Sequence, residues 1–205
     1  VLVNDGKDDL SGNNKQYLDA VNFIDDYIHN PVNLGVGKSK NILLRKMLDN
    51  ECEHFFIIED DTIIKDAIVF QKYIDTSIVS GIKHLSYGPG SPLNLKQNNQ
   101  VDIYNRDELN TTLEPDPKLT INYNNDIGVV LYHHCVGMFC YFHRSVLEKV
   151  GLIDEIYYNA WDHVDHTLEI INAGYHPPFW WFADISNSEK YLSPADEYHI
   201  KNSII

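Results

Sequence analysis

Residues 54–61 read HFFIIEDD, and this stretch decides the fold that we expect for the chain. A short apolar run is followed directly by three acids, Glu59, Asp60 and Asp61. A continuous apolar run of this length is typical of a strand that is buried on both faces of a sheet. Ligands of open α/β sheets bind outside the carboxyl ends of the strands, which is where the three acids would lie. The stretch therefore predicts a buried strand that ends at a binding site.

Three adjacent carboxylates repel one another, so their position at a strand end indicates a bound positive charge. A hard divalent cation such as Mn²⁺ or Mg²⁺ prefers carboxylate oxygens as ligands and would neutralise the cluster. The alternative is a solvated turn, because acidic residues are common in turns. We favour the metal site because the cluster follows a buried strand.

The segments on either side of this stretch alternate between strand and helix patterns. Strand patterns cover VLVNDG (1–6), 85–88 and 129–142, and helix patterns cover 14–30, 41–50, 66–79, 144–151 and 162–174. Residues 89–128 are rich in Asn, Pro and Asp, and we interpret them as loops and short hairpin strands. Strands that alternate with helices predict one α/β sandwich domain with a mostly parallel central sheet.

The composition excludes several classes of protein. The chain has 205 residues, of which 43% are hydrophobic, so we expect a globular fold. Its formal net charge of −14 repels nucleic-acid backbones, and the sequence offers no basic patch for them. A run of about 18 apolar residues is absent, so we expect no membrane span in the chain. Three cysteines without disulfide-like spacing indicate a reducing compartment.

Residues 33–41 read NLGVGKSKN and contain the Gly-Lys-Ser of a phosphate-binding P-loop. A P-loop needs a further glycine before its Gly-Lys pair, so that successive backbone N–H groups can surround a phosphate. Val32 occupies the position of that glycine, so the motif is incomplete. The stretch is better explained as a different loop of a nucleotide site.

The helix predicted over 162–174 carries acids beside an aromatic residue. Asp162, Asp165 and Glu169 lie at positions i, i+3 and i+7, so they share one face of the helix. An acid at a helix start is often only a cap or a partner of the helix dipole. Trp161 beside these acids also suits a sugar, whose ring has an apolar face and many hydroxyls. This helix is a further expected part of a binding site.

Four segments in this order resemble family 2 glycosyltransferases of the GT-A fold, which use a nucleotide-diphosphate sugar as donor. The segments are VNDGKDD (3–9), NLGVGKSKN (33–41), IIEDDT (57–62) and WDHVDHTLEIINAGY (161–175), and the resemblance covers about residues 1–185. It implies a Rossmann-like α/β/α sandwich, in which residues 1–88 bind the nucleotide sugar and residues 129–205 form the acceptor side. The first strand of that fold is missing before VNDG, so we expect this single domain to be a fragment of a longer protein.

The resemblance also implies a role for each candidate residue. The donor would be a UDP-sugar, with Asp5 at the uracil, and the cofactor would be Mn²⁺ or Mg²⁺. The residues implied to bind the nucleotide are Asp5, Asn33, Gly35, Lys40, Glu59 and Asp60. Asp61 would ligate the metal together with Glu59, and Trp161 and Asp165 would bind the acceptor.

Three departures from the family pattern bear on the catalytic residues. Lys40 stands where the family usually has arginine, and Glu59 replaces the frequent first aspartate of the metal motif. His163 stands where the helix motif has its second acid. The base that deprotonates the acceptor hydroxyl is then Asp162 or His163. We favour Asp162, because backbone N–H groups hold an acid at a helix start.

The sequence thus predicts a metal-dependent inverting glycosyltransferase, which moves a hexosyl or N-acetylhexosaminyl group from a UDP-sugar to a hydroxyl. The acceptor would be a carbohydrate or glycoconjugate, in the synthesis of a polysaccharide or glycoconjugate. The alternatives are a nucleotidyltransferase of similar sandwich fold and a catalytically inactive sugar-binding module. We expect a cytoplasmic protein, with the inner membrane surface as the other location if missing parts of the protein attach it there.

Overall fold

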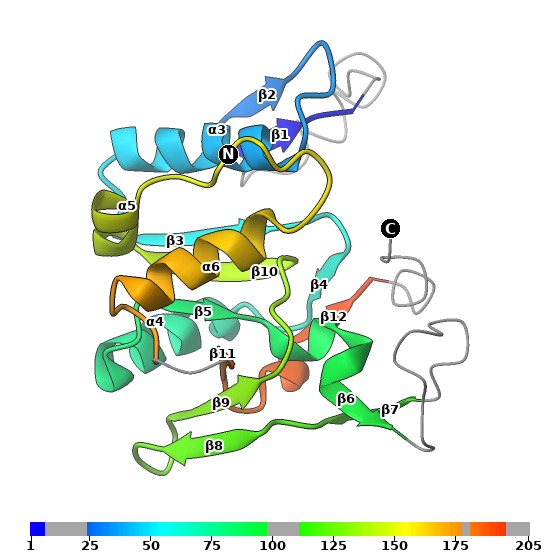
Figure 1. Ribbon diagram of the computed structural model, residues 1–205, viewed down its shortest axis with the longest axis vertical. Coiled ribbons are helices and arrows are strands. Elements are labelled where there is room, and N and C mark those ends of the chain that lie inside the picture. The colour runs from blue at the N-terminus through cyan, green and yellow to red at the C-terminus, as the bar shows by residue number, and fades with distance from the viewer. Residues whose placement is uncertain (7–23, 98–110, 178–180, 196–205) are drawn as a thin grey trace.

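A three-stranded sheet forms the centre of the molecule in the computed structural model, which describes residues 1–6, 24–97, 111–177 and 181–195 (Figure 1). Its strands are β3 (His54–Ile58), β10 (Phe139–His143) and β5 (His84–Ser86), with β10 in the middle. Because β10 pairs antiparallel with both neighbours, β3 and β5 run in the same direction. The strand expected at 54–61 is therefore an edge strand of this sheet, and its acids follow its carboxyl end.

The prediction of a GT-A-type, Rossmann-like sandwich with a mostly parallel central sheet is wrong. The described residues form five small sheets of two or three strands, and β1 (Leu2–Asn4) with β2 (Tyr27–His29) is their one parallel pair. The strands of the other sheets pair antiparallel. One sheet has β9 (Gly128–Tyr132) between β8 (Leu119–Asn122) and β11 (Phe182–Ile185). The other two are the pair of β4 (Thr62–Ile64) with β12 (Leu192–Pro194) and the pair of β6 (Leu95–Gln97) with β7 (Thr111–Pro115). The alternation of strand and helix patterns carries no signal for the direction in which β10 enters between β3 and β5.

Alternate side chains of β10 pack into two separate apolar clusters. Phe139 and Tyr141 belong to one cluster, and Cys140 and Phe142 belong to the other. Successive side chains of a strand point to opposite faces of its sheet, so each face of the central sheet is covered. All four residues are at most 3% exposed, so β10 is buried on both faces.

Helices cover one face of the central sheet, and a helix with a second sheet covers the other (Figure 1). The helices α3 (Val36–Asp49), α5 (Arg144–Val150) and α6 (Asp162–Asn172) pack on the face of Cys140 and Phe142. The helix α4 (Ile68–Ser80) and the sheet β8–β9–β11 pack on the face of Phe139 and Tyr141. This arrangement brings the N-terminal ends of α3 and α6 toward the residue after β3, because Lys40 binds both Glu59 and Asp162 there.

Two expected elements differ from the structure near the start of the chain. The helix predicted over 14–30 is wrong at residues 27–29, which form β2, and residues 7–23 lie outside the described part. The helix predicted over 41–50 begins earlier, at Val36, because Gly35 adopts a positive φ of 88° that starts it there. A further strand beside β1, as the resemblance implies, stays a prediction.

The region expected to hold loops and short hairpin strands contains both. In its described part, two short 3₁₀ helices, Gly88–Gly90 and Pro92–Asn94, precede β6, β7 and β8, and residues 98–110 lie outside that part. Within the described ranges, none of the helices is long and apolar enough to cross a membrane.

Candidate functional site

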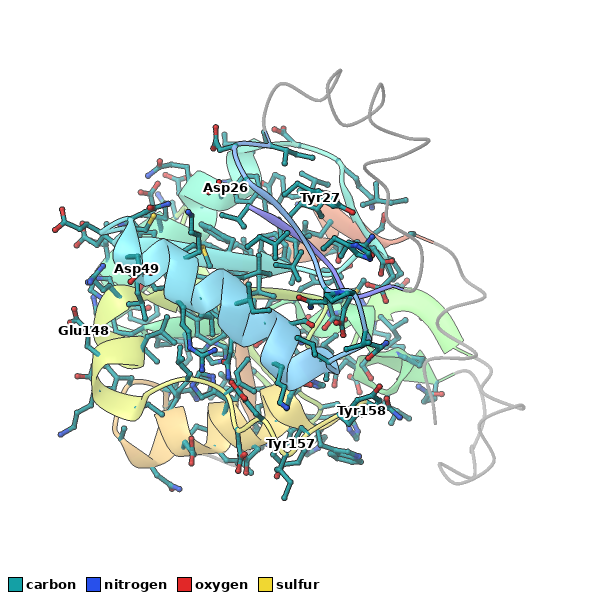
Figure 2. The ribbon with its side chains drawn as sticks, turned by 90° about the horizontal axis from the view of Figure 1, so that it is seen from above. Asp26, Tyr27, Asp49, Glu148, Tyr157 and Tyr158 are labelled. Atoms are coloured by element: carbon teal, nitrogen blue, oxygen red, sulfur yellow. The ribbon has the colours of Figure 1, made fainter. Side chains whose placement is uncertain are left out.

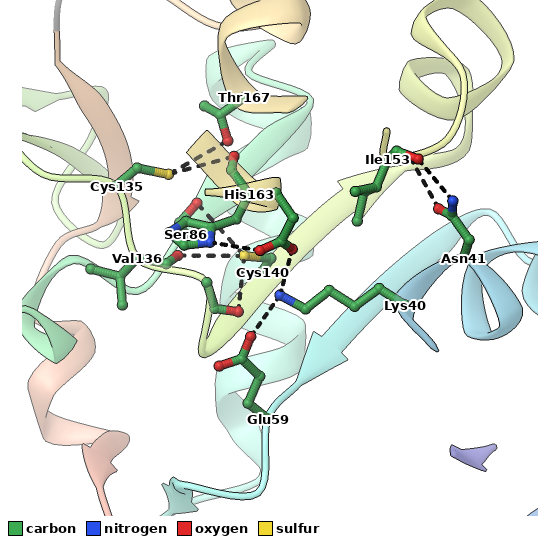
Figure 3. A network of polar contacts seen from close by, with 12 residues as sticks. Lys40, Asn41, Glu59, Ser86, Cys135, Val136, Cys140, Ile153, His163 and Thr167 are labelled. Atoms are coloured by element: carbon green, nitrogen blue, oxygen red, sulfur yellow. Dashed lines mark hydrogen bonds and ion pairs between the residues drawn. The ribbon is translucent and has the colours of Figure 1, made fainter. Parts of the chain in front are cut away.

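Lys40 holds two carboxylates together at the carboxyl end of β3 (Figure 3). Its Nζ lies 2.6 Å from Oε1 of Glu59 and 2.9 Å from Oδ2 of Asp162. The lysine comes from the first turns of α3, Glu59 directly follows β3, and Asp162 is the first residue of α6. Two consecutive elements, α3 and β3, and the distant α6 therefore meet at one ammonium group.

This charge cluster is buried, and its members change one another's ionisation. Lys40 is 6% exposed and Asp162 is 1% exposed. Burial alone would raise the pKa of Asp162, but its contacts with His163 and Lys40 hold that pKa far below the ordinary value. Burial alone would lower the pKa of Lys40, but the charges of Glu59 and Asp162 raise it well above the ordinary value. Lys40 and Asp162 are therefore both charged at neutral pH.

His163 extends the cluster toward solvent. Its Nδ1 lies 3.3 Å from Oδ1 of Asp162, and its side chain is 24% exposed. The imidazole also lies close to the backbone of Gly137: a Cβ at Gly137 would be 2.8 Å from Nδ1 of His163 and 3.3 Å from Oε1 of Glu59. Glycine at this position therefore makes room for the imidazole and the glutamate together.

The space beside the cluster is small. A cavity of about 10 Å³ is lined by Lys40, Asp162 and His163 together with apolar side chains such as Ile57 and Phe142. This volume has room for about one water molecule and not for a sugar ring. A larger ligand would contact the cluster through its partly exposed members, the side chains of His163 and Glu59, which are 24% and 34% exposed.

Asp5 organises the loop that contains Asn33 and Gly35. Its Oδ1 accepts hydrogen bonds from Leu34 N and Asn30 Nδ2 at 2.9 and 2.8 Å, and its Oδ2 accepts one from Gly35 N at 2.9 Å. Burial opposes these bonds, but together they lower the pKa of Asp5 below its ordinary value. The side chain of Asn33 also accepts from Gly35 N at 2.9 Å. The structure thus brings Asp5, Asn33 and Gly35 together, with both carboxylate oxygens of Asp5 bound by groups of this chain, and a role for them at a nucleotide stays a prediction.

Two backbone carbonyls cap the N-terminus of α3. Val36 N donates to Tyr158 O at 2.8 Å, and Gly37 N donates to Tyr157 O at 3.2 Å. Figure 2 shows Tyr157 and Tyr158 beside that end of α3. With Gly35 N bound by Asp5, the backbone donors of residues 35–37 are in use, whereas a P-loop would direct such donors at a phosphate. This arrangement agrees with the sequence-based conclusion that the loop is not a P-loop, which followed from Val32 at the position of the required glycine.

The acidic turn after β3 is the predicted metal site. Asp60 is exposed and Asp61 is half-buried, while Glu59 has one oxygen on Lys40. The described part of the chain has no group of three or more His, Cys, Asp or Glu side chains placed to hold a metal ion. A Mg²⁺ ion at a nucleotide site needs only one or two protein carboxylates, because phosphate oxygens and waters complete its coordination. The donor set at Asp60 and Asp61 fits that type of site.

The acids predicted on one face of α6 lie in different environments. Asp162 is buried, Asp165 is half-buried and Glu169 is exposed, so the shared face turns from the core toward solvent. Desolvation and the neighbouring Asp165 carboxylate raise the pKa of Tyr157, so Asp165 faces the 154–161 loop. Trp161 is 64% exposed and has a positive φ of 74°, which is unusual for a bulky residue. The exposed indole of Trp161, two residues before His163 in the chain, is accessible to a ligand.

The sequence did not single out the close approach of Gly137 or the carbonyls of Tyr157 and Tyr158. Backbone carbonyls carry no sequence signal, and Gly137 resembles any other loop glycine.

No protein-family model matches the chain, and no curated protein sequence matches it. The candidate functional site therefore rests on the geometry of the Lys40 cluster, the Asp5 loop and the acidic turn.

Proposed function

We propose that this chain is a metal-dependent, inverting glycosyltransferase that moves a sugar from a UDP-sugar to a hydroxyl group of a carbohydrate or glycoconjugate. The observation that carries the proposal is the meeting of Glu59 and Asp162 on Lys40 at the carboxyl end of β3. That meeting joins the acidic turn to the start of α6. A cation site for the donor diphosphate and a base for the acceptor hydroxyl would then lie within one small region.

The donor would bind along the acidic turn and the Asp5 loop. A chain with a net charge of −14 repels a bare diphosphate, so a cation has to lie between them. Asp61, with Asp60 beside it, would hold Mn²⁺ or Mg²⁺, and Glu59 would support that site through its second oxygen. When bound, the cation supplies Lewis-acid stabilisation of the charge that develops on the departing diphosphate. Asp5 keeps the 33–35 loop in the conformation that receives the uridine.

The acceptor would bind at the start of α6. Trp161 presents its indole to solvent, and Asp165 lies one helical turn away from it. Aromatic faces and carboxylates together suit a sugar, because a sugar ring has an apolar face bordered by hydroxyl donors. The acceptor hydroxyl would then lie beside Asp162 and His163, the two candidate bases.

The decisive experiment measures UDP release from a panel of UDP-sugars, with Mn²⁺ or with EDTA. We expect release with at least one UDP-sugar in Mn²⁺ and none in EDTA. Calorimetry of UDP binding complements it: wild type should bind in Mn²⁺ and lose that binding in EDTA, and Asp61→Ala should bind weakly in both. Equal UDP affinity under all conditions and in both proteins would contradict the metal site. Binding of UDP without any release would favour the inactive sugar-binding module.

A matched control for Asp61→Ala is Asp126→Ala. Asp126 is an exposed acid in the turn between β8 and β9, far in the sequence from the acidic turn at residues 59–61. Both substitutions change the net charge equally, so a general charge effect would alter UDP affinity in both variants. A loss of affinity in Asp61→Ala alone assigns the effect to the site.

A further inference from the structure

Asp162 is poorly placed to be the base, although its position in the sequence favours it. Its Oδ2 binds Lys40 at 2.9 Å and its Oδ1 faces His163 at 3.3 Å. The residue is 1% exposed, and the adjacent cavity has room for about one water molecule. A general base has to come within about 2.6–3.2 Å of the proton that it removes. An acceptor sugar that lies outside the cavity cannot bring its hydroxyl to this carboxylate.

The same contacts determine the state of the neighbouring imidazole. An ionised carboxylate can only accept hydrogen bonds, so Nδ1 of His163 must carry the hydrogen in its contact with Asp162. In a neutral ring the other nitrogen, Nε2, then has a free lone pair that can accept a proton. The side chain of His163 is 24% exposed, so this ring is accessible where the carboxylate is not.

The imidazole is also held in place from two sides. Lys40, itself bound to Glu59, fixes the carboxylate of Asp162, and so fixes the acceptor for Nδ1. Gly137 approaches the ring so closely that any side chain there would displace it. Lys40, Asp162 and Gly137 therefore determine which nitrogen is protonated and where the ring lies.

We propose that His163 is the catalytic base of the transfer reaction and that Asp162, held by Lys40, is a positioning residue for it. This assignment rests on the proposed function. In the reaction, the acceptor oxygen forms a bond to the anomeric carbon and its proton passes to Nε2 of His163. The bond from the anomeric carbon to the diphosphate oxygen breaks, and its electron pair leaves with UDP. The imidazolium that forms lies against the Asp162 carboxylate, which stabilises its charge.

The first test reads the tautomer of His163 and needs no substrate. The ¹⁵N spectrum of the histidine side chains is recorded at about pH 8.5, above the ordinary imidazole range, and His163→Gln identifies the signal of His163. Wild type should show the Nδ1–H tautomer. In Asp162→Asn, Lys40 binds the amide oxygen, so the amide NH₂ turns toward Nδ1 and should force the Nε2–H tautomer. An Nε2–H tautomer in wild type, or the same tautomer in both proteins, overturns the positioning role.

The second test measures kcat and the KM for the donor separately. In His163→Gln, kcat should fall by about 10²–10⁴-fold, the usual range for loss of a general base, with donor KM changed less than about threefold. Asp162→Asn should lose a comparable factor in kcat because its imidazole has the wrong tautomer. Gly137→Ala should also lower kcat, although it changes no charge. The control His133→Gln removes an exposed histidine and should keep the wild-type kcat.

Chemical rescue separates a base from a structural residue. Added imidazole should restore part of kcat to His163→Gly and none to Asp162→Asn, which retains its own imidazole. If His163→Gln keeps near-normal kcat while Asp162→Asn is inactive, Asp162 is the base and the inference is wrong. If wild type transfers no sugar from any donor, the proposed function fails and the role of base fails with it. The tautomer measurement then still decides whether Asp162 positions His163.

Discussion

Asp184 in β11 is a buried carboxylate that only donors surround. Tyr73 Oη and Ile185 N donate to Oδ1 at 2.5 and 2.7 Å, and Ser188 Oγ and Gly88 N donate to Oδ2 at 2.5 and 2.9 Å. Each oxygen thus accepts from one backbone N–H, which cannot be reoriented. The carboxylate links β11 to Tyr73 of α4 and to Gly88, which follows β5. It lies on the face of the central sheet that carries Phe139 and Tyr141, opposite to the face on which α3 and α6 pack.

We predict that Asp184→Asn lowers the free energy of unfolding by about 3 kcal/mol. Whichever way the new amide is turned, its NH₂ faces a backbone N–H, so two buried donors lose their acceptor. Burial raises the pKa of Asp184 to about 7, so urea unfolding is compared at about pH 8, where the group is charged. The exposed control Asp126→Asn should change stability by less than about 0.5 kcal/mol. Equal stability of the Asp184 variant and wild type would show that the four contacts contribute little.

Lys40 has a structural role that pH can reveal. The pKa of Asp162 is lowered, so its contribution to stability is fully present above about pH 4 and is lost as the pH falls further. The pKa of Lys40 is raised, so its contribution is fully present below about pH 10 and is lost as the pH rises further. Between these limits the contributions of Asp162 and Lys40 are both present.

We predict that Lys40→Met lowers the free energy of unfolding by about 3 kcal/mol at pH 7, because one partner of a buried ion pair is removed. Without the lysine, burial raises the pKa of Asp162, so the native variant takes up a proton as the pH falls. The loss should therefore be smaller at pH 5 than at pH 7. Urea unfolding of both proteins at both pH values measures this, with Lys38→Met as an exposed control on the same helix. A loss of equal size at pH 5 and pH 7 would contradict the predicted pKa change.

At the residue scale, the sequence singled out Glu59, Asp162 and Lys40 but did not predict how they pair. Glu59 and Asp162 were both expected at a binding site, since one follows a buried strand and the other begins a helix. Lys40 was expected near a nucleotide, yet it binds both carboxylates. The ion pair of Lys40 with Asp162 joins residues more than 100 positions apart and depends on how α3 and α6 pack on the same face of the central sheet, which no local pattern encodes.

At the scale of elements, the docking of the 154–161 loop on α3 depends on Gly37. A Cβ at this position would lie 3.0 Å from the carbonyl oxygens of Asp154 and Tyr157. Both obstacles are backbone atoms, which cannot rotate away as a side chain does. This loop leads directly into Trp161 and Asp162, so its position determines where α6 begins.

We predict that Gly37→Ala lowers the free energy of unfolding by about 1–3 kcal/mol, because the loop has to move away from the helix. Alanine normally favours a helix over glycine by about 1 kcal/mol, so a destabilising result would identify the close contact as its cause. The control Lys38→Ala lies on the same turn with an exposed side chain and should be neutral. Urea unfolding of the three proteins measures the effect. A stabilised Gly37→Ala variant would show that the loop adapts without cost.

The sequence predicted the positions of helices with clear apolar spacing well, but it did not predict the short strand β2. The helices predicted over 66–79, 144–151 and 162–174 correspond to α4, α5 and α6 within about two residues, because their apolar spacing and terminal glycines are clear. Residues 27–29 continue a helical spacing of apolar residues, yet they form β2 by pairing with β1. A three-residue strand takes its structure from its partner, so its own sequence is a weak guide.

At the scale of the whole molecule, the direction of one strand explains why the expected sheet is wrong. β3 and β5 flank a helix and run the same way, as the alternating pattern predicts. β10 then lies between them and runs in the opposite direction. The other antiparallel sheets include pairs of strands that are consecutive in the chain, such as β8 and β9. Pairing between segments about 80 residues apart is a tertiary property, which local periodicity does not contain.

The net charge is also a property of the whole molecule, and it predicts how salt acts on stability. The chain has 30 Asp and Glu residues against 16 Lys and Arg, so charge repulsion disfavours the compact state at neutral pH. Salt shortens the range of this repulsion, since the Debye length falls to about 10 Å at 0.1 M ionic strength. We predict that raising NaCl from about 20 to 300 mM at pH 7.5 increases the free energy of unfolding by about 1 kcal/mol.

The same salt series at a lower pH provides the control. Near the sequence pI of about 4.9 the net charge vanishes, so screening has no net repulsion to relieve and added NaCl should leave stability nearly unchanged. Urea unfolding at both pH values, with and without salt, measures the four free energies that are needed. The Lys40 cluster responds little to salt because buried pairs are weakly screened, so the effect reports on the surface charges. If NaCl lowers stability at pH 7.5, attraction within surface ion pairs such as Arg45–Glu155 outweighs the excess of negative charge, and the prediction is wrong.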